Sequence, residues 1–583
     1  MKYPTLYTKQ NSRQMVDVFK GYNHNLRIGD GEFFDMKNMT SDHYPILSPR
    51  GKRGVYASAN APTGLVAKDS LCYVDGSKFV INEYSIEMNL SDEPKQLISM
   101  GAYVIIMPDK KYINTEDLTD FGNIEAFFTA PSARYAMCKA DGTEYGDINI
   151  CQSPVPPDPE DYYLWLDQTS TPHVLKEYSV SSGLWAQIAT TYVRISAPGI
   201  AENFKQYDAV KISGLPPQLS EMDDTACVLW DAYHDPNSGA NDYIIIVGTL
   251  GEVTAYEHEL KLERTMPVMD FVIEANNRLW GCRYGTANNG QVVNEIYCSK
   301  LGDFKNWICY MGISTDSWTA SCGTDGQWTG AITHMGYPLF FKENYVHKVY
   351  GNYPANFQVQ TTPCKGVQKG CEKSLAIVNT TLFYKARSGV CAYDGSLPSE
   401  MSYALGNEAY EGAVGGAHGN KYYISMKDTS EKYHLFVYDV SKGMWHREDD
   451  FQADYFCSCR GDLYAISNGK IITMLGSGTA DSLPVEWMAE TGEIGISSPD
   501  MKYISRITLR MSMDIGSEVT IYAQYDFNEE WEQVCILTSD SLRSFSIPIR
   551  PKRCDHMKLR IEGVGAVKIY SITKTIEQGS ELS

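Results

Sequence analysis

The chain of 583 residues lacks a long apolar segment, a leader-like start and an excess of basic charge. No apolar run approaches the roughly 18 residues that a membrane-spanning helix needs, so no membrane insertion is expected. The opening "MKYPTLYTKQNSRQ" lacks the apolar core of a secretion signal. The formal net charge of −21 excludes a general nucleic-acid binder, because phosphate contacts need Lys and Arg. The acidity either serves solubility or lets DNA pass an acidic wall without binding.

Metal-binding cysteine patterns are also missing. The 15 cysteines are scattered, and only Cys457 and Cys459 lie close together. CxxC is absent, so the two-plus-two ligand spacing of a structural zinc site is absent too. We expect reduced thiols from folding in a cytoplasm. Either of the acidic turns "DTSEKYHL" and "DGTEYGD" could bind calcium weakly, but neither matches a recognised calcium loop. The sequence therefore predicts no metal and no cofactor.

Familiar catalytic motifs are absent as well. The chain has no GxSxG, HExxH, P-loop or dinucleotide fingerprint. The pairs Asp223-Asp224 and Asp449-Asp450 fall in turns, where adjacent carboxylates are usually solvated, and nothing nearby selects one as acid and one as base. "SKLGDFKNW" (299–307) partly resembles the Asp-box of sialidase-like propellers, an element that is remote from their active sites. We expect that the chain is not an enzyme and has no catalytic residues.

Aromatic residues and a loose repeat are what the sequence does contain. Forty tyrosines raise the aromatic share to 12%, which favours half-buried sheet surfaces and extensive contacts. Short alternating strands joined by Gly, Asn and Asp turns recur around Leu339, Leu382, Tyr422 and Leu463, at spacings of 43, 40 and 41 residues. A period near 40 with several strands per unit is typical of β-propeller blades. Small sheets packed radially bury the faces that one sheet alone exposes.

The repeat is interrupted once and then ends. "PVPPDPEDYY" (154–163) forms a stiff boundary, and the rhythm is lost until about residue 262. After residue 478, about seven alternating strands suit a β-sandwich. The expected fold class is all-β, a β-propeller with an inserted small β-barrel or platform domain and a C-terminal β-sandwich.

The expected domains follow from these boundaries. They are an N-terminal strap at 1–55, first blades at 56–153, the platform domain at 154–265, remaining blades at 266–478 and the sandwich at 479–583. The expected blade count is about six to eight, and the first blade can take strands from both ends of the propeller, which leaves no free sheet edge.

Two segments resemble a known group of proteins. "FKGYNHNLRIGDGEFFDMKNMTSDHYPILSPRGKRG" (19–54) looks like the N-terminal signature of virion proteins from tailed phages and prophages of Firmicutes-type bacteria, in which "GEF-D-N" precedes "YP-LS-R--R". The strands from "YISRITLRMSM" to "KIYSITKTIEQGS" (503–580) are similar to the C-terminus of that group. The order of domains also resembles the podophage tail nozzle family, known as tail tubular protein B.

This resemblance implies a structural protein of a bacteriophage tail. A nozzle-type protein forms a homo-oligomer, a hexameric ring that lines the DNA exit channel and takes part in DNA ejection. Its partners are the adaptor, other tail proteins and genome DNA, which passes without sequence-specific binding. It is located in the virion tail and assembles in the host cytoplasm.

Two other readings stay open. One is a carbohydrate-binding or carbohydrate-acting propeller that serves in host-receptor recognition, because Tyr and Trp stack on sugars. The other is a cellular propeller scaffold, which needs only the general features of the chain.

The strap supplies the one set of candidate site residues. Pro45 and Pro49 fix its bends, and Arg50, Lys52 and Arg53 give it a basic end in an acidic chain. One interpretation is that these three side chains simply face solvent. The other is that they contact an acidic surface of a neighbouring subunit, so they form a candidate assembly contact.

Overall fold

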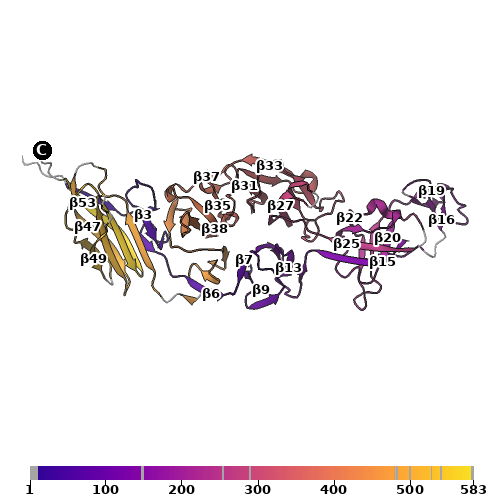
Figure 1. The fold of residues 1–583 in the computed structure, drawn as a ribbon, viewed down its shortest axis with the longest axis horizontal. Coiled ribbons are helices and arrows are strands. Elements are labelled where there is room, and N and C mark those ends of the chain that lie inside the picture. Colours follow the sequence, from indigo (N-terminus) through magenta and orange to yellow (C-terminus); the bar gives the residue numbers. More distant parts are fainter. Residues whose placement is uncertain are drawn as a thin grey trace, which may run out of the picture.

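A computed structural model gives the structure of the chain. It describes residues 11–145, 150–171, 173–252, 255–287, 290–477, 479–480, 483–497, 501–526, 528, 530–538 and 541–578. These residues form strands and four 3₁₀ turns but no α-helix, and no described helix has the length and apolarity to cross a membrane. The molecule is elongated, with a β-sandwich at one end, a propeller in the middle and an inserted domain at the other end (Figure 1). The all-β prediction is confirmed.

Seven blades of the described residues form the propeller: five are separate four-stranded sheets, the sixth is part of a ten-stranded sheet and the seventh is a five-stranded sheet. Blades 1 and 2 are β7 (Pro62–Lys68), β8 (Ser70–Asp75), β9 (Lys78–Ile81) and β10 (Tyr84–Glu87), then β11 (Gln96–Met100), β12 (Tyr103–Met107), β13 (Lys111–Asn114) and β14 (Phe121–Asn123). Blades 3 and 4 are β26 (Phe271–Ala275), β27 (Arg278–Thr286), β28 (Val292–Cys298) and β29 (Trp318–Ser321), then β30 (Gly330–His334), β31 (Tyr337–Lys342), β32 (Tyr345–Tyr350) and β33 (Gln358–Pro363).

The last three blades contain one strand from the N-terminal region. Blades 5 and 6 are β34 (Ala376–Val378), β35 (Thr381–Ala386), β36 (Gly389–Tyr393) and β37 (Ser399–Glu400), then β38 (Tyr410–His418), β39 (Lys421–Asp428), β40 (Tyr433–Asp439) and β41 (Met444–Arg447). Blade 7 is β42 (Tyr455–Cys459), β43 (Asp462–Ser467), β44 (Lys470–Thr473) and β6 (Gly54–Ser58), with β45 (Thr479–Ala480) also paired to β6. Blade 7, the last blade in the chain, therefore combines β42, β43 and β44 from the C-terminal end of the propeller with β6 from its N-terminal end.

The repeat read from the sequence is confirmed. Leu339, Leu382, Tyr422 and Leu463 all lie on the second strand of a blade, and all four side chains are fully buried. The innermost strands of neighbouring blades contact one another, except that β30 of blade 4 contacts the 3₁₀ turn η3 that leads into blade 5. β42 of blade 7 lies between β38 of blade 6 and β7 of blade 1. The seven blades fall within the predicted range.

The inserted domain begins earlier than expected. It starts at β15 (Ala126–Cys138), which pairs with β25 (Tyr256–Arg264) and β20 (Tyr192–Ser196), so the predicted boundary at 154 is wrong. The prolines after residue 153 instead separate two strands of a small sheet inside this domain. That sheet contains β16 (Ile150–Ser153), β17 (Leu164–Asp167), β18 (Val174–Ser179) and β19 (Leu184–Gln187). The larger sheet adds β21 (Ala209–Ser213), β22 (Thr225–Val228), β23 (Asp231–Tyr233) and β24 (Tyr243–Val247), with a 3₁₀ turn η1 (Pro217–Met222).

Two sheets form the C-terminal sandwich, and each takes a strand from the strap. One contains β1 (Asn11–Val16), β53 (Val567–Gln578), β47 (Lys502–Met513), β50 (Arg543–Ile547) and β51 (Arg553–Cys554). The other contains β3 (Glu32–Lys37), β46 (Glu486–Thr491), β52 (Met557–Val564), β48 (Glu518–Tyr525) and β49 (Glu532–Leu537). Along β47, buried Ile507, Leu509 and Met511 alternate with more exposed residues, as the two-residue period of a strand requires.

The strap also joins the sandwich to the propeller. Its short strands are β2 (Gly21–Tyr22), β4 (Met39–Thr40) and β5 (Ser48–Pro49). Tyr22 pairs with Trp445 of β41, and β2 pairs with β3, so blade 6 continues into one sheet of the sandwich. The segment expected to be an irregular strap therefore contributes strands to both sheets of the sandwich and extends the sheet of blade 6. At its end, the chain continues into β6, which completes blade 7.

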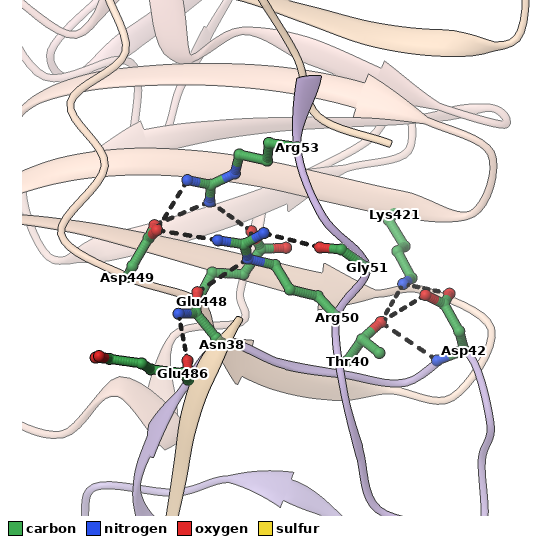
Figure 2. A network of polar contacts seen from close by, with 10 residues as sticks. All are labelled: Asn38, Thr40, Asp42, Arg50, Gly51, Arg53, Lys421, Glu448, Asp449 and Glu486. Atoms are coloured by element: carbon green, nitrogen blue, oxygen red, sulfur yellow. Dashed lines mark hydrogen bonds and ion pairs between the residues drawn. The ribbon is translucent and has the colours of Figure 1, made fainter. Parts of the chain in front are cut away.

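A buried polar network fixes the end of the strap (Figure 2). Arg53 forms ion pairs of 2.7 Å to Glu448 and 2.8 Å to Asp449, and Arg50 reaches the same carboxylates at 3.3 and 3.2 Å. Arg50 also donates to Asn38, whose side chain donates to the backbone of Glu486 in β46. The network therefore connects the strap, blade 6 and the sandwich.

The network corrects one expectation from the sequence. Asp449 was expected to be solvated, but its side chain is only 24% exposed. Burial alone would raise the pKa of the Asp449 carboxyl, but Arg53 and Arg50 outweigh burial and the pKa is lowered. Burial alone would likewise lower the pKa of the Arg53 guanidinium, but Glu448 and Asp449 raise it. Each charge in this network therefore depends on its partners.

Replacing Arg53 by Met should destabilise the protein strongly. The change leaves Glu448 and Asp449 buried with less compensation, and loss of one partner of a buried pair costs about 3–5 kcal/mol. The measurement is the midpoint of urea unfolding. Lys432→Met is the control, because it removes a half-exposed ion pair to Asp450 and should cost less than about 1 kcal/mol. Equal midpoints for the two variants would contradict this role of Arg53.

Candidate functional site

The seven blades leave a cavity at the end of the propeller axis where the innermost strands begin. Its volume is about 370 Å³. We call it the mouth cavity. Its lining comes from all seven blades and the segments that lead into them: Leu65, Pro94, Lys95, Gln96, Leu97, Asp270, Phe271, Ala331, Glu372, Lys373, Leu375, Val414, Gly415, Tyr455 and Phe456. A cavity of this size, with apolar walls and a few polar groups, is typical of a small-ligand site.

Close contacts between neighbouring blades hold the lining residues in place. The Gln96 side chain accepts a hydrogen bond from the Val272 amide and donates one of 2.6 Å to the Val272 carbonyl, which joins blade 2 to blade 3. A Cβ on Gly415 would lie 2.5 Å from the Ser374 carbonyl oxygen, and one on Gly416 would lie 2.5 Å from Cβ of Phe456. The glycine-rich stretch of β38 therefore permits blades 5, 6 and 7 to approach one another.

Lys373 places a positive charge at the mouth cavity. It lies in the 3₁₀ turn η3 (Glu372–Ser374), directly before the innermost strand of blade 5. Its ammonium donates to the Asp454 carbonyl at 3.2 Å and lies 3.7 Å from the centre of the Tyr455 ring. Burial lowers the pKa of Lys373, although Glu372 and Asp454 oppose this. None of the described carboxylates forms an ion pair with this ammonium.

Asp270 also lines the mouth cavity, and the Asp454 carboxyl lies close enough to the Lys373 ammonium to influence its pKa. Asp270 at the rim accepts a hydrogen bond of 2.8 Å from the Tyr284 amide, and partial burial of its carboxyl raises its pKa. Burial also raises the pKa of Asp454, although Lys373 opposes the shift. These groups can exchange hydrogen bonds with hydroxyl groups, while the Tyr455, Phe456 and Phe271 rings offer apolar surface.

No metal site was found in the described part of the chain, where no group of three or more His, Cys, Asp and Glu side chains could hold an ion.

The strap residues predicted as an assembly contact lie elsewhere. Arg50 and Lys52 line a cavity of about 410 Å³ between the strap and the sandwich. The acidic partners of Arg50 and Arg53 belong to the same chain, and the side chains of these two are only 13% and 12% exposed. Lys52 is exposed. A contact of these three residues with a neighbouring subunit stays a prediction.

Sequence reasoning missed the residues of the mouth cavity. Asp270, Lys373 and Tyr455 come from blades 3, 5 and 7, and no local motif contains them. The one signal that could have located the cavity was the repeat, because it marks where the innermost strand of each blade begins, and the lining residues lie on or next to these strands.

Comparisons with known proteins found distant likenesses of fold. No protein-family model matches the chain, and no curated protein does. Among solved structures, an exo-β-1,3-galactanase from Phanerochaete chrysosporium is 9% identical, covers 52% of this chain and 94% of its own, and has a TM-score of 0.20. A glycoside hydrolase family 43 arabinoxylan arabinofuranohydrolase from Bacillus subtilis is 9% identical, with coverages of 53% and 95% and a TM-score of 0.19.

A third similar structure spans most of the chain. The extracellular domain of a putative hybrid two-component system from B. thetaiotaomicron is 8% identical, covers 94% of this chain and 99% of its own, and has a TM-score of 0.21. The first two matched structures are enzymes that act on carbohydrates, and this contradicts the prediction that the chain is not an enzyme. At these identities and TM-scores, no activity or site residue is transferred to this chain.

Replacing Asp454 by Asn should raise the melting temperature at pH 7. The folded-state pKa of Asp454 lies above its ordinary value of 3.8, so ionisation of this carboxyl costs stability as pH rises through that pKa. The gain in melting temperature should shrink as pH falls toward 3.8 and disappear below it, because the Asp454 carboxyl is then protonated in both the folded and the unfolded state. Melting temperatures between pH 3 and 8 measure it.

Asp449→Asn is the matched control with the opposite sign. The folded-state pKa of Asp449 lies below 3.8, so its charge stabilises the fold above that pH and the benefit is lost as pH falls through the folded-state pKa. This variant should lower the melting temperature at pH 7. A fall in melting temperature at pH 7 for Asp454→Asn as well would show that the Asp454 charge stabilises the fold.

Proposed function

We propose that this chain is a bacteriophage tail protein whose propeller binds a carbohydrate at the mouth cavity. The observation that carries the binding site is the convergence of an ammonium, carboxyl groups and aromatic rings from different blades on one cavity. The signature at 19–54 and the strands at 503–580 support the tail assignment. The function of such a protein is recognition of a saccharide receptor on the host surface.

The side chains of the mouth cavity suit a sugar ring in two ways. The Tyr455 and Phe456 rings offer faces on which the C–H side of a sugar packs. The Lys373 ammonium has three donors and uses one on the Asp454 carbonyl, so it can donate to ring hydroxyls or to an acidic substituent. The hydrogen-bonded blades hold both groups before the ligand arrives, which reduces the entropy lost on binding.

Replacing Lys373 by Met should weaken binding of host-wall polysaccharide fragments about ten- to a hundredfold, since a hydrogen bond to a charged group contributes about 1.5–3 kcal/mol. Isothermal titration calorimetry on the full chain measures this, with Lys432→Met as a control that removes the same charge away from the mouth cavity. Release of reducing ends in the same samples shows whether the sugar is also cleaved. Absence of glycan binding by the natural chain, or unchanged binding by Lys373→Met, would contradict the proposed site.

A second candidate function is a nozzle-type ring that lines the DNA exit channel. The arrangement of domains favours it, because the inserted domain lies at one end of an elongated molecule and the sandwich at the other (Figure 1). This matches the plan implied by the resemblance to tail nozzle proteins. The net charge of −21 also suits a wall that DNA passes without binding.

Electron microscopy of the purified chain tests the second candidate. The expected result is a closed ring with sixfold symmetry and acidic side chains along its bore. Permanent rings bury interfaces of about 2,000 Å² or more, so the ring should persist at nanomolar concentration. A monomer at micromolar concentration that is also absent from phage particles would rule out the nozzle function.

A further inference from the structure

A second cavity lies on the flank of the propeller between blades 3 and 4. Its volume is about 630 Å³. We call it the flank pocket. Its lining is Tyr310, Gly312, Ile313, Ser314, Asp316 and Ser317 from the segment before β29, Trp318 and Thr319 from the start of β29, and Tyr353, Pro354 and Ala355 from the segment that leads into β33. We propose that the flank pocket is a second carbohydrate site that takes a neutral sugar ring. This inference rests on the proposed function in one respect: both assume that the ligand is a carbohydrate.

A buried arginine fixes one wall of the flank pocket. Arg278 of β27 is 1% exposed, and its guanidinium donates hydrogen bonds of 2.8 Å to the Ser314 carbonyl and 2.6 Å to the Asp316 carbonyl. The Asp316 carboxylate in turn accepts hydrogen bonds of 2.6 and 3.1 Å from the amides of Gly312 and Ile313. The segment that carries Tyr310 is therefore held in one shape.

The opposite wall is fixed in a similar way. The 3₁₀ turn η2 (Pro354–Asn356) follows Tyr353, and the Asn356 side chain accepts hydrogen bonds of 2.9 Å from the Asn352 amide and 3.1 Å from the Tyr353 amide. The position of the Tyr353 backbone is therefore set before any ligand binds, and preformed walls lower the entropic cost of binding.

Aromatic surface remains exposed between these fixed walls. The side chains of Tyr310 and Tyr353 are 59% and 44% exposed. Trp318 is partly exposed, and its ring packs edge-on against Trp280 and Phe357, with ring centres 6.0 and 5.6 Å apart. Large aromatic side chains usually bury most of their surface, so three in one preformed cavity indicate a stacking site.

The polar groups of the flank pocket select a neutral ligand. Asp316 is the one charged residue in its lining, and two backbone amides already bind its carboxylate. The remaining polar side chains are the indole of Trp318 and five hydroxyl groups, those of Tyr310, Ser314, Ser317, Thr319 and Tyr353. A neutral sugar combines an apolar C–H face for the rings with hydroxyls for this rim. The mouth cavity differs, because its lining includes four charged residues, Lys95, Asp270, Glu372 and Lys373.

Saturation-transfer NMR and calorimetry on the full chain, with neutral hexose oligosaccharides as probes, test this inference. Tyr353→Ala and Tyr310→Ala should each weaken binding about three- to tenfold, the range for loss of one aromatic contact. Both side chains are exposed, so folding should be unaffected. Tyr403→Ala is the matched control, because Tyr403 is 78% exposed and belongs to neither cavity.

The pattern across variants separates this inference from the proposed function. If Lys373→Met keeps neutral-sugar binding and Tyr353→Ala weakens it, the flank pocket is the neutral-sugar site whether or not the mouth cavity binds. If Tyr353→Ala and Tyr310→Ala bind neutral sugars as tightly as the natural chain, the flank inference is overturned. It is equally overturned if these variants instead dissociate an oligomer, because the flank pocket is then an interface between copies.

Discussion

Closure of the seventh blade by β6 is the constraint on which the rest of the structure depends. Each blade buries its faces against two neighbours, so an open ring would expose the faces of two blades and the edge of β44. β6 covers that edge through pairs such as Thr473 with Gly54. The strands β6 and β44 are more than 400 residues apart in the chain. Their pairing closes a long loop at an entropic cost, so we expect it to form late in folding, after both regions have been synthesised. The ion pairs of Arg50 and Arg53 stand directly before β6 and set the place where it enters.

The same segment makes the propeller and the sandwich mechanically continuous. The strap pairs with β53 through β1, with β41 through β2 and with β46 through β3. Blade 6 lies between blades 5 and 7, which supply Lys373 and Tyr455 to the mouth cavity. Backbone hydrogen bonds therefore connect the sandwich to the blade that lies between these two residues.

The sequence predicted the parts of the fold that repeat and missed those that occur once. Leu339 and Tyr422 mark second strands because burial at a fixed place in each blade imposes a period. The strap has no period, since its strands pair with partners hundreds of residues away. Four prolines near residue 154 looked like a domain boundary, whereas β15 before them has the alternation of a blade strand and pairs inside the inserted domain. Asp449 looked solvated because its arginine partners are remote in sequence. The mouth cavity could not be predicted from the sequence either, because each blade contributes only a few lining residues and these are remote from one another in the chain.

The two candidate functions do not compete for the same residues. A nozzle requires contacts between copies and an acidic bore, whereas sugar recognition requires the mouth cavity, the flank pocket or both. Single sugar contacts with aromatic rings are weak, and a monomer with two such cavities would bind a cell surface only briefly. A ring of copies changes this, because each further site then binds at the high effective concentration that its neighbours create. Assembly would therefore turn weak saccharide sites into firm attachment. The net charge of −21, which would repel DNA, would leave binding of a neutral ligand in the flank pocket unaffected.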